Sequence, residues 1–418
     1  MTEVQPSAGK SNAKRVLIVS VDDPWKGGGV GGKHTHIRLL QKGLRAAGVN
    51  ADVVSVRKTE SFKWLHLYPG ALRRRLMSGK GDRYAHYVKQ YEDQLRRNLS
   101  KVVLDYDWYN PHDVVAAEVL SERLVGKEKT TPVVLTLHGY FTREAASDSE
   151  ISESSEHYGR YTAIERKACE RAWRILCVDT RIRDYVASSF GAKDNKLSVI
   201  PNAVDTDAFS PKTDDQRIES RKTLGLPSDL FVILCPRRLV AKNGVSYCVK
   251  SIPLLSNKGH NVLLVLAGDG PERKAVEELV NSGRLNDRTT LAGSVPHDRM
   301  PAYYAAADAV VIPSVLSAGV EEATSLSMLE GMSSGRPVVV TDVGGLKETV
   351  KDHQTGLIVR QADPAAIAGA IHELIKDKQL GARLGTAARE YVVGNHSYIA
   401  HAKHVLEEYE RAARNGPD

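Results

Sequence analysis

The sequence lacks several features that mark common classes of protein. No stretch of its 418 residues approaches about 18 uninterrupted apolar residues, so we predict no membrane-spanning helix. The polar segment 1–14 has no apolar core of signal-peptide length, and we expect a disordered tail there. The four cysteines have no C-x-x-C spacing, so reduced thiols are expected in place of disulfides or zinc ligands. These absences favour a cytoplasmic protein.

Positive charge is unevenly distributed along the chain. The net charge is +7, and the segment 57–101 alone carries twelve basic residues against four acidic ones. Its densest point is Arg73, Arg74 and Arg75, in the same segment as Trp64. This mixture suits contact with the inner face of an anionic membrane or with an anionic acceptor, but it is equally typical of a solvated helix face. We expect no nucleic-acid partner, because no recognised binding motif accompanies the charge.

Strand-like and helix-like segments alternate along most of the chain. Such alternation predicts parallel sheets that helices cover on both faces, and therefore an α/β protein. The predicted strands lie at 15–21, 51–56, 113–117, 132–137 and 175–179 in the first half, and at 231–235, 262–267, 289–291, 308–312 and 337–340 in the second.

These two series of strands predict two doubly wound domains. We place the first domain at 15–195 and the second at 196–395, followed by a final helix at 396–418. Ligands of open parallel sheets bind beyond the carboxyl ends of the strands. A site is therefore expected in a cleft where those ends of the two domains face each other.

The glycine-rich segment 27–34 matches two familiar patterns in its letters but not in its context. It contains G-x-G-x-x-G, typical of dinucleotide-binding folds, and nearly the P-loop pattern, with His34 in place of the required Ser or Thr. Five residues separate the preceding strand from the first glycine, and the second strand ends in Arg57 and Lys58 instead of a ribose-binding acid. An NADP-dependent oxidoreductase is therefore a less favoured alternative.

Glu322 and Glu330 stand on either side of a predicted helix start near Ser325. We expect this helix to end at Gly335 and Pro337. The N–H groups and the dipole of a helix N-terminus attract phosphate, and carboxylates accept hydrogen bonds from hydroxyls. A nucleotide sugar offers ribose hydroxyls, a diphosphate and sugar hydroxyls in this order. Two ordinary surface glutamates near a helix start are the alternative interpretation.

The seven-residue spacing of these glutamates resembles the E-x7-E signature of retaining glycosyltransferases of family 4. Further similarity lies in Gly31-Gly32 followed by His36, in Thr136-x-His138, in Arg238-Leu239 followed by a lysine, and in the turn that begins at Gly293. One departure concerns Lys242, which follows Arg238 by four residues where the family pattern has five. Asn243 occupies the usual lysine position.

The resemblance implies the GT-B fold, in which two Rossmann-like domains face each other across a cleft and a C-terminal helix crosses back to the first domain. It implies an enzyme that moves a hexosyl-type sugar from a nucleoside diphosphate sugar, with UDP as our guess, to an acceptor hydroxyl in glycan, glycolipid or glycoconjugate biosynthesis. The anomeric configuration would be retained without an essential metal or other cofactor. A sugar-nucleotide epimerase on the same fold is an alternative.

The same resemblance assigns roles to individual residues. Catalytic roles fall to His138, Arg238, Lys242 and Glu322, and the base of the nucleotide is expected near Gly293 and Val295. Contacts to the rest of the donor are expected from Gly31, Gly32, Thr324, Ser325, Leu326, Ser327 and Glu330, together with Arg238, Lys242 and Glu322. On the acceptor side we expect His36, Trp64, Arg73, Arg74 and Arg75. No residue is expected to bind a metal.

Overall fold

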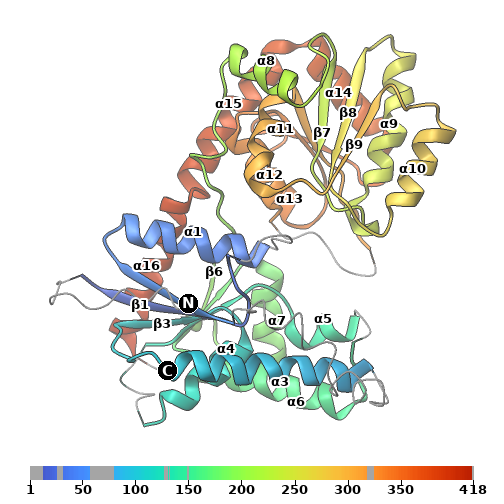
Figure 1. Ribbon diagram of the computed structural model, residues 1–418. Helices are drawn as coiled ribbons and strands as arrows, with labels where there is room; N and C mark the ends of the chain where they lie inside the picture. Colours follow the sequence, from blue (N-terminus) through green and yellow to red (C-terminus); the bar gives the residue numbers. More distant parts are fainter. Residues whose placement is uncertain are drawn as a thin grey trace. The chain divides into compact units, whose positions relative to one another are not determined.

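The computed structural model describes residues 13–25, 32–56, 80–126, 130, 132–147, 150–317 and 324–416. These residues form two compact units (Figure 1). The first unit comprises the described parts of Met1–Pro201 and His401–Asp418, and the second comprises those of Asn202–Ala400. None of the helices in these described ranges is long and apolar enough to cross a membrane.

The second unit is built on one six-stranded parallel sheet. Its strands are β7 (Phe231–Cys235), β8 (Val262–Ala267), β9 (Thr289–Gly293), β10 (Ala309–Ile312), β11 (Val338–Thr341) and β12 (Leu357–Val359). Their order in the sheet is β12-β11-β10-β7-β8-β9. Strand β8 is buried along its whole length, as expected for a parallel strand covered on both faces.

Helices cover both faces of this sheet and enclose two separate apolar cores. The helices are α8 (Asp214–Thr223), α9 (Val245–Asn257), α10 (Arg273–Ser282), α11 (Met300–Ala306), α12 (Leu326–Ser333), α13 (Gly344–Thr349), α14 (Pro364–Lys376) and α15 (Lys378–Asn395), with 3₁₀ turns η4 (Ala241–Asn243) and η5 (His297–Arg299). One core takes residues from α9, α10 and α14, and the other takes residues from α11, α12 and α13. The unit is therefore doubly wound.

The strand order of this sheet reverses between β7 and β10. The chain runs outward from β7 through β8 to β9, and outward from β10 through β11 to β12 on the other side. Ligands of such sheets bind between the loops that follow the two strands at the reversal, which is called the switch point. Backbone packing is close at this edge. A Cβ at Gly244 (φ +61°) would collide with the Pro313 carbonyl, and one at Gly268 with the Arg237 carbonyl.

The first unit carries two three-stranded parallel sheets, with the orders β2-β1-β3 and β4-β5-β6. Their strands are β1 (Arg15–Ser20), β2 (Asn50–Ser55), β3 (Trp108–Pro111), β4 (Val134–Leu137), β5 (Arg174–Cys177) and β6 (Leu197–Val199). A parallel bridge between Tyr109 and Val133 connects the two sheets. The surrounding elements are α1 (Gly32–Ala46), α3 (Lys80–Leu99), α4 (Val114–Arg123), α5 (Phe141–Ser147), α6 (Glu156–Arg171), α7 (Thr180–Phe190) and η3 (Asp194–Lys196).

One predicted strand is wrong. Residues 113–117 begin helix α4, and the strand at this point of the chain is β3, which ends two residues earlier. Asp113 is the N-cap of α4, and its Oδ1 accepts a hydrogen bond from the N–H of Ala116 at 2.6 Å. A short apolar run does not distinguish a buried helix from a strand, whereas β3 mixes aromatic, polar and proline residues and gives no clear strand pattern.

All four cysteines are buried and free of disulfides, as predicted. Burial raises the pKa of the Cys169 and Cys177 thiols to about 12, so both stay protonated at neutral pH. These thiols therefore behave as small apolar core residues.

Helix α16 (Tyr398–Asn415) packs one face against the first unit. Ala402, Val405, Tyr409 and Ala412 belong to the same apolar core as residues of β1, β3 and α1. Their spacing of three, four and three residues places them along one stripe of the helix. The end of the chain thereby completes the core of the first unit (Figure 1).

Replacing Val405 with alanine should destabilise the first unit. The Val405 side chain is 1% exposed in the core that contains Trp108 and Trp173, so the loss of two methyl groups should lower the free energy of unfolding by about 2 kcal/mol. All four tryptophans precede residue 202, and urea unfolding followed by tryptophan fluorescence therefore reports on this unit. Ile399→Ala is the control, because Ile399 is 58% exposed on the same helix. Equal stability of the two variants would contradict the packing of α16.

Candidate functional site

Helix α12 begins at the carboxyl edge of the second sheet. Ser325 is its N-cap, and Oγ of Ser325 accepts a hydrogen bond from the N–H of Met328. The helix start predicted near Ser325 is therefore confirmed. Thr324 and Ser325 are buried, whereas Leu326 and Ser327 are half-buried. Because N–H groups of a first turn lack partners within the helix, they and the helix dipole can bind a phosphate group.

The Arg237 side chain crosses the switch point of the second sheet. Arg237 follows β7 and is 9% exposed. Its Nη1 donates to Oγ of Ser325 at 3.0 Å, while Nη2 donates to Oγ of Ser314 at 3.0 Å and to Oδ1 of Asn243. One guanidinium thus connects the loop after β7, the loop after β10 and the start of α12. We predicted no role for Arg237, because two adjacent arginines after a strand do not indicate which is buried.

Arg238 and Lys242, the two predicted cationic site residues, have exposed side chains. Within the described ranges, neither side chain has a hydrogen-bond or ion-pair partner. Asn243, which follows Lys242 in the chain, is buried. Its Nδ2 donates to the Arg238 carbonyl at 2.8 Å. A lysine at position 243 would bring an ammonium against the Arg237 guanidinium, and like charges repel strongly when buried. The neutral amide of Asn243 instead accepts a hydrogen bond from Nη2 of Arg237.

Glu330 is 5% exposed, and both of its oxygens have partners. Oε1 lies 2.8 Å from Nε2 of His297 in η5, and Oε2 accepts a hydrogen bond from the Tyr304 hydroxyl of α11 at 2.8 Å. Burial, and after it the Glu330 carboxylate, raises the pKa of Tyr304 well above its usual value, so the phenol stays protonated and donates. A carboxylate has about four acceptor positions, and Glu330 therefore keeps capacity for ligand hydroxyls.

We did not predict that His297 and Tyr304 contact Glu330. These contacts join η5, α11 and α12, and no residue spacing in a sequence predicts that three such elements pack together. The predicted base-side residues lie just before η5. Gly293 ends β9 with a φ of +69°, and Val295 is half-buried against the core that contains α12. The turn expected near the nucleotide base thus leads directly to a residue that contacts Glu330.

Lys33 of the glycine-rich segment is held by two carboxylates. Its Nζ lies 2.9 Å from Asp22 and 2.8 Å from Asp113. Burial lowers the pKa of Lys33, but the charges and hydrogen bonds of Asp113 and Asp22 outweigh burial and raise the pKa above its usual value. Gly32 begins α1, which carries Lys33 in its first turn. An ammonium engaged in this way does not cradle a phosphate as a P-loop lysine does.

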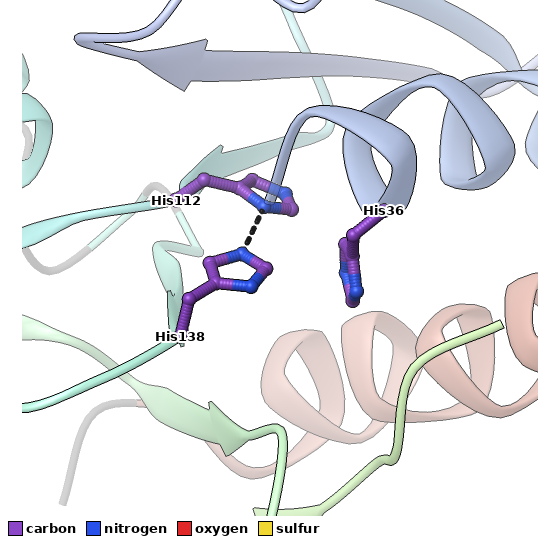
Figure 2. Close-up of side chains that lie close together, drawn as sticks. All are labelled: His36, His112 and His138. Carbon is purple, nitrogen blue, oxygen red and sulfur yellow. Dashed lines mark hydrogen bonds between the residues drawn. The ribbon is translucent and has the colours of Figure 1, made fainter. Parts of the chain in front are cut away.

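Three histidines meet at the carboxyl edge of the first sheets (Figure 2). His36 lies on α1, His112 follows β3 and His138 follows β4. The ring centroids of His36 and His138 are 4.6 Å apart, and Nδ1 of His112 is 3.1 Å from Nε2 of His138. Burial, reinforced by His36, lowers the pKa of His112 and His138 well below the usual value, so both rings are neutral. His36 and His138 were predicted as site residues, whereas His112 was not.

Several predicted site residues lie outside the described part of the chain. These are Gly31, Trp64, Arg73, Arg74, Arg75 and Glu322. Their roles stay predictions.

Comparison with known proteins connects both units to one group of enzymes. A family model described as Glycosyltransferase Family 4 matches residues 30–208, and a model described as Glycosyl transferases group 1 matches residues 216–391. The first match ends and the second begins close to the division between the two units.

Individual proteins show the same similarity. The chain is 26% identical over 380 residues to the uncharacterized glycosyltransferase MJ1607 of Methanocaldococcus jannaschii, with 88% of each chain covered. It is 28% identical over 301 residues to the GDP-mannose-dependent alpha-(1-6)-phosphatidylinositol monomannoside mannosyltransferase of Mycobacterium tuberculosis, covering 72% of this chain and 74% of the relative. The solved structure of the sucrose-phosphate synthase of Thermosynechococcus elongatus superposes with a TM-score of 0.70 at 22% identity, covering 95% of this chain and 98% of that chain.

The fold and these similarities define a glycosyltransferase with the GT-B fold, as predicted. The chain belongs to glycosyltransferase family 4.

Arg237 and Arg238 should differ in their contribution to stability. Arg237→Met removes one hydrogen bond from each of three buried polar partners and should lower the free energy of unfolding of the second unit by about 1–3 kcal/mol. Arg238→Met changes an exposed side chain and should alter stability by less than about 0.5 kcal/mol. Scanning calorimetry of both variants measures this difference. Equal melting temperatures would show that Arg237 does not hold the switch point together.

Proposed function

We propose that this glycosyltransferase moves a hexosyl-type sugar from a nucleoside diphosphate sugar to an acceptor hydroxyl, with retention of the anomeric configuration. The observation that carries the proposal is the arrangement at the switch point of the second sheet. There the start of α12 contacts the buried guanidinium of Arg237, and α12 also carries the carboxylate of Glu330. A cation beside the start of a short helix and a carboxylate on that helix suit a ligand that alternates phosphate and sugar.

The departure of a nucleoside diphosphate creates negative charge that the enzyme must stabilise in the transition state. We assign this role to the N–H groups at the start of α12 and to Arg238, with Lys242 as a further cation. Arg238 and Lys242 are exposed and face no protein partner in the described ranges, so they are available to a ligand. The acceptor hydroxyl would then attack from the face that the diphosphate leaves.

The hydroxyls of the donor require acceptors on both sides of the diphosphate. We assign the ribose hydroxyls to Glu330, because His297 and Tyr304 hold its carboxylate in one orientation. We assign the sugar hydroxyls to Glu322. The mycobacterial relative is named as GDP-mannose-dependent, which supports a nucleoside diphosphate hexose as donor. UDP stays our guess for the nucleoside diphosphate itself.

The acceptor side is proposed to include His36, His138 and the basic segment 57–101. On α3 this charge is already offset, because Arg96 pairs with Glu122 at 2.7 Å and Lys89 with Asp93 at 3.1 Å. A contact with an anionic acceptor or membrane surface would therefore rest mainly on the part of the segment before α3.

A screen of nucleotides and their sugars tests the proposed function. Ligands that bind the native state raise its melting temperature, so UDP, GDP, ADP and their hexose derivatives should separate into binders and non-binders. Proton NMR of the reaction with the donor that binds, with and without simple acceptors, then shows whether the sugar is transferred or epimerised and whether its configuration is retained. Binding of NADP without any sugar nucleotide would favour the oxidoreductase instead.

Glu330→Ala should weaken binding of the free nucleoside diphosphate, whereas Glu322→Ala should mainly lower turnover of the intact donor. A hydrogen bond to a charged group contributes about 1.5–3 kcal/mol, so the dissociation constant of the Glu330 variant should rise about 10- to 100-fold. Calorimetric titration measures it. Glu330→Gln keeps one acceptor oxygen and should lie between wild type and alanine. Equal loss of affinity in the Glu322 and Glu330 alanine variants would overturn the two assignments.

Activity should persist after removal of divalent metals. The two Asp-x-Asp sequences of the chain have structural partners: Asp107 accepts hydrogen bonds from Lys14 and from the N–H of Arg15, and Asp207 accepts one from the Tyr398 hydroxyl. Arginine, lysine and a helix N-terminus supply positive charge where a metal would otherwise be needed. Dialysis against EDTA followed by an assay of sugar transfer checks this. Complete loss that magnesium or manganese restores would contradict it.

A further inference from the structure

Hydrogen bonds lead from α16 to His138 through the interior of the first unit. The Tyr409 hydroxyl donates to Oδ1 of Asn110 at 2.7 Å, and Nε2 of His112 lies 2.8 Å from the same oxygen. On the other side of its ring, Nδ1 of His112 lies 3.1 Å from Nε2 of His138 (Figure 2). Tyr409, Asn110 and His112 are each at most 1% exposed, so water does not compete for these contacts.

The amide of Asn110 fixes where the protons of this chain lie. Its Nδ2 donates to the Val134 carbonyl at 2.5 Å and to Oγ1 of Thr136 at 2.9 Å, so Oδ1 is the atom that faces His112. An amide oxygen accepts hydrogen bonds and never donates, and Nε2 of His112 must therefore carry a proton. A neutral imidazole has one N–H. Nδ1 of His112 is thus unprotonated and accepts a hydrogen bond from Nε2–H of His138.

The same reasoning leaves Nδ1 of His138 unprotonated. Because the ring is neutral and its proton is on Nε2, the second nitrogen has a free lone pair. The two nitrogens of an imidazole point in divergent directions, so Nδ1 faces away from His112 (Figure 2). No hydrogen bond from the described residues reaches this atom, and the His138 side chain is half-buried. A ligand can therefore reach it.

We propose that Tyr409, Asn110 and His112 are positioning residues that hold His138 as a hydrogen-bond acceptor for a substrate hydroxyl. The inference rests on the proposed function, because the substrates of a sugar transferase are rich in hydroxyls. A neutral ring with an unprotonated Nδ1 favours a hydroxyl, which donates, over a phosphate oxygen, which only accepts. Since Tyr409 lies on α16, the last helix of the chain helps to set the chemistry of a residue that follows β4.

A metal ion is the other ligand that these histidines could take. One nitrogen from each of His36, His112 and His138 lies within 4.8 Å of the other two. Two observations favour the hydrogen-bonded arrangement. Nε2 of His138 carries the proton that His112 accepts, so a metal at that nitrogen would have to displace it. The ammonium of Lys33 also disfavours positive charge at His112 and His138.

Imidazole ¹⁵N NMR of the full-length protein reads the tautomers directly. In protein labelled with [¹⁵N]histidine, the ring signals of residue 138 are assigned by their loss in His138→Gln. The proposal expects an N–H at Nε2 and an unprotonated Nδ1 in wild type, unchanged across neutral pH. A protonated Nδ1 in wild type would overturn it. This measurement needs no activity, so a protein with the expected tautomer that transfers no sugar would refute the proposed function and leave the tautomer assignment standing.

Two substitutions at His112 separate positioning from structure. His112→Phe keeps a ring but removes the acceptor, so kcat/KM should fall about tenfold, as expected for one hydrogen bond. His112→Asn offers an oxygen near the position of Nδ1 and should recover most of this loss. Affinity for the free nucleoside diphosphate should not change, because we assign the nucleotide to the second unit. A higher KM for the donor or for the acceptor identifies whose hydroxyl His138 contacts.

A double-mutant cycle and a metal titration complete the test. If His112 acts through His138, His112→Phe should cause no further loss in a His138→Ala background. An equal loss in both backgrounds would assign His112 a structural role and overturn the proposal. Equilibrium dialysis with Zn²⁺ should show no site that His112→Phe removes. One equivalent of zinc bound by wild type and lost in this variant would establish a metal site in its place.

Discussion

The buried guanidinium of Arg237 is the contact on which the site of the second unit depends. Loops that follow β7 and β10 leave neighbouring strands at the switch point, where the N–H of Val315 donates to the Lys242 carbonyl at 2.9 Å. Arg237 ties both loops to the start of α12 by reaching Ser314, Asn243 and Ser325 at once, which the planar fork of a guanidinium allows and the point charge of a lysine does not. Because Ser325 is the N-cap of α12, the same contact holds the helix start where a phosphate would bind.

The two units present different chemistry at the carboxyl edges of their sheets. In the second unit, exposed cations and a helix start give this edge a positive character that suits a diphosphate. In the first unit, Lys33 is neutralised by Asp22 and Asp113, and the neighbouring imidazoles His112 and His138 are neutral. An edge of this kind suits hydroxyl groups better than phosphate. The edge of the second unit thus suits the anionic diphosphate of a sugar nucleotide. The edge of the first unit suits the neutral hydroxyls of the sugar and of the acceptor.

The sequence predicts features that depend on neighbouring residues and misses those that depend on the folded interior. The start of α12 was predictable because a serine followed by an apolar run has a local cause, the satisfaction of a free N–H. The strand predicted at 113–117 is wrong because Asp113 caps a helix. An apolar run does not show whether the polar residue before it is a helix cap or part of a turn. The buried contacts of Arg237 were missed for a related reason, since burial is decided by residues far along the chain.

Both sites are oriented by buried polar side chains that come from distant parts of the sequence. Tyr409 and Asn110 are 299 positions apart, and Glu330 takes its partners from two other elements. A buried hydrogen bond adds only about 0.5–1.5 kcal/mol to stability, so an apolar core would serve stability equally well. Such contacts instead hold a side chain in one orientation. A side chain needs a fixed orientation to distinguish a hydroxyl, which donates, from an oxygen that only accepts. In the proposed function, the buried partners of Glu330 and His138 therefore matter as much as the groups they orient.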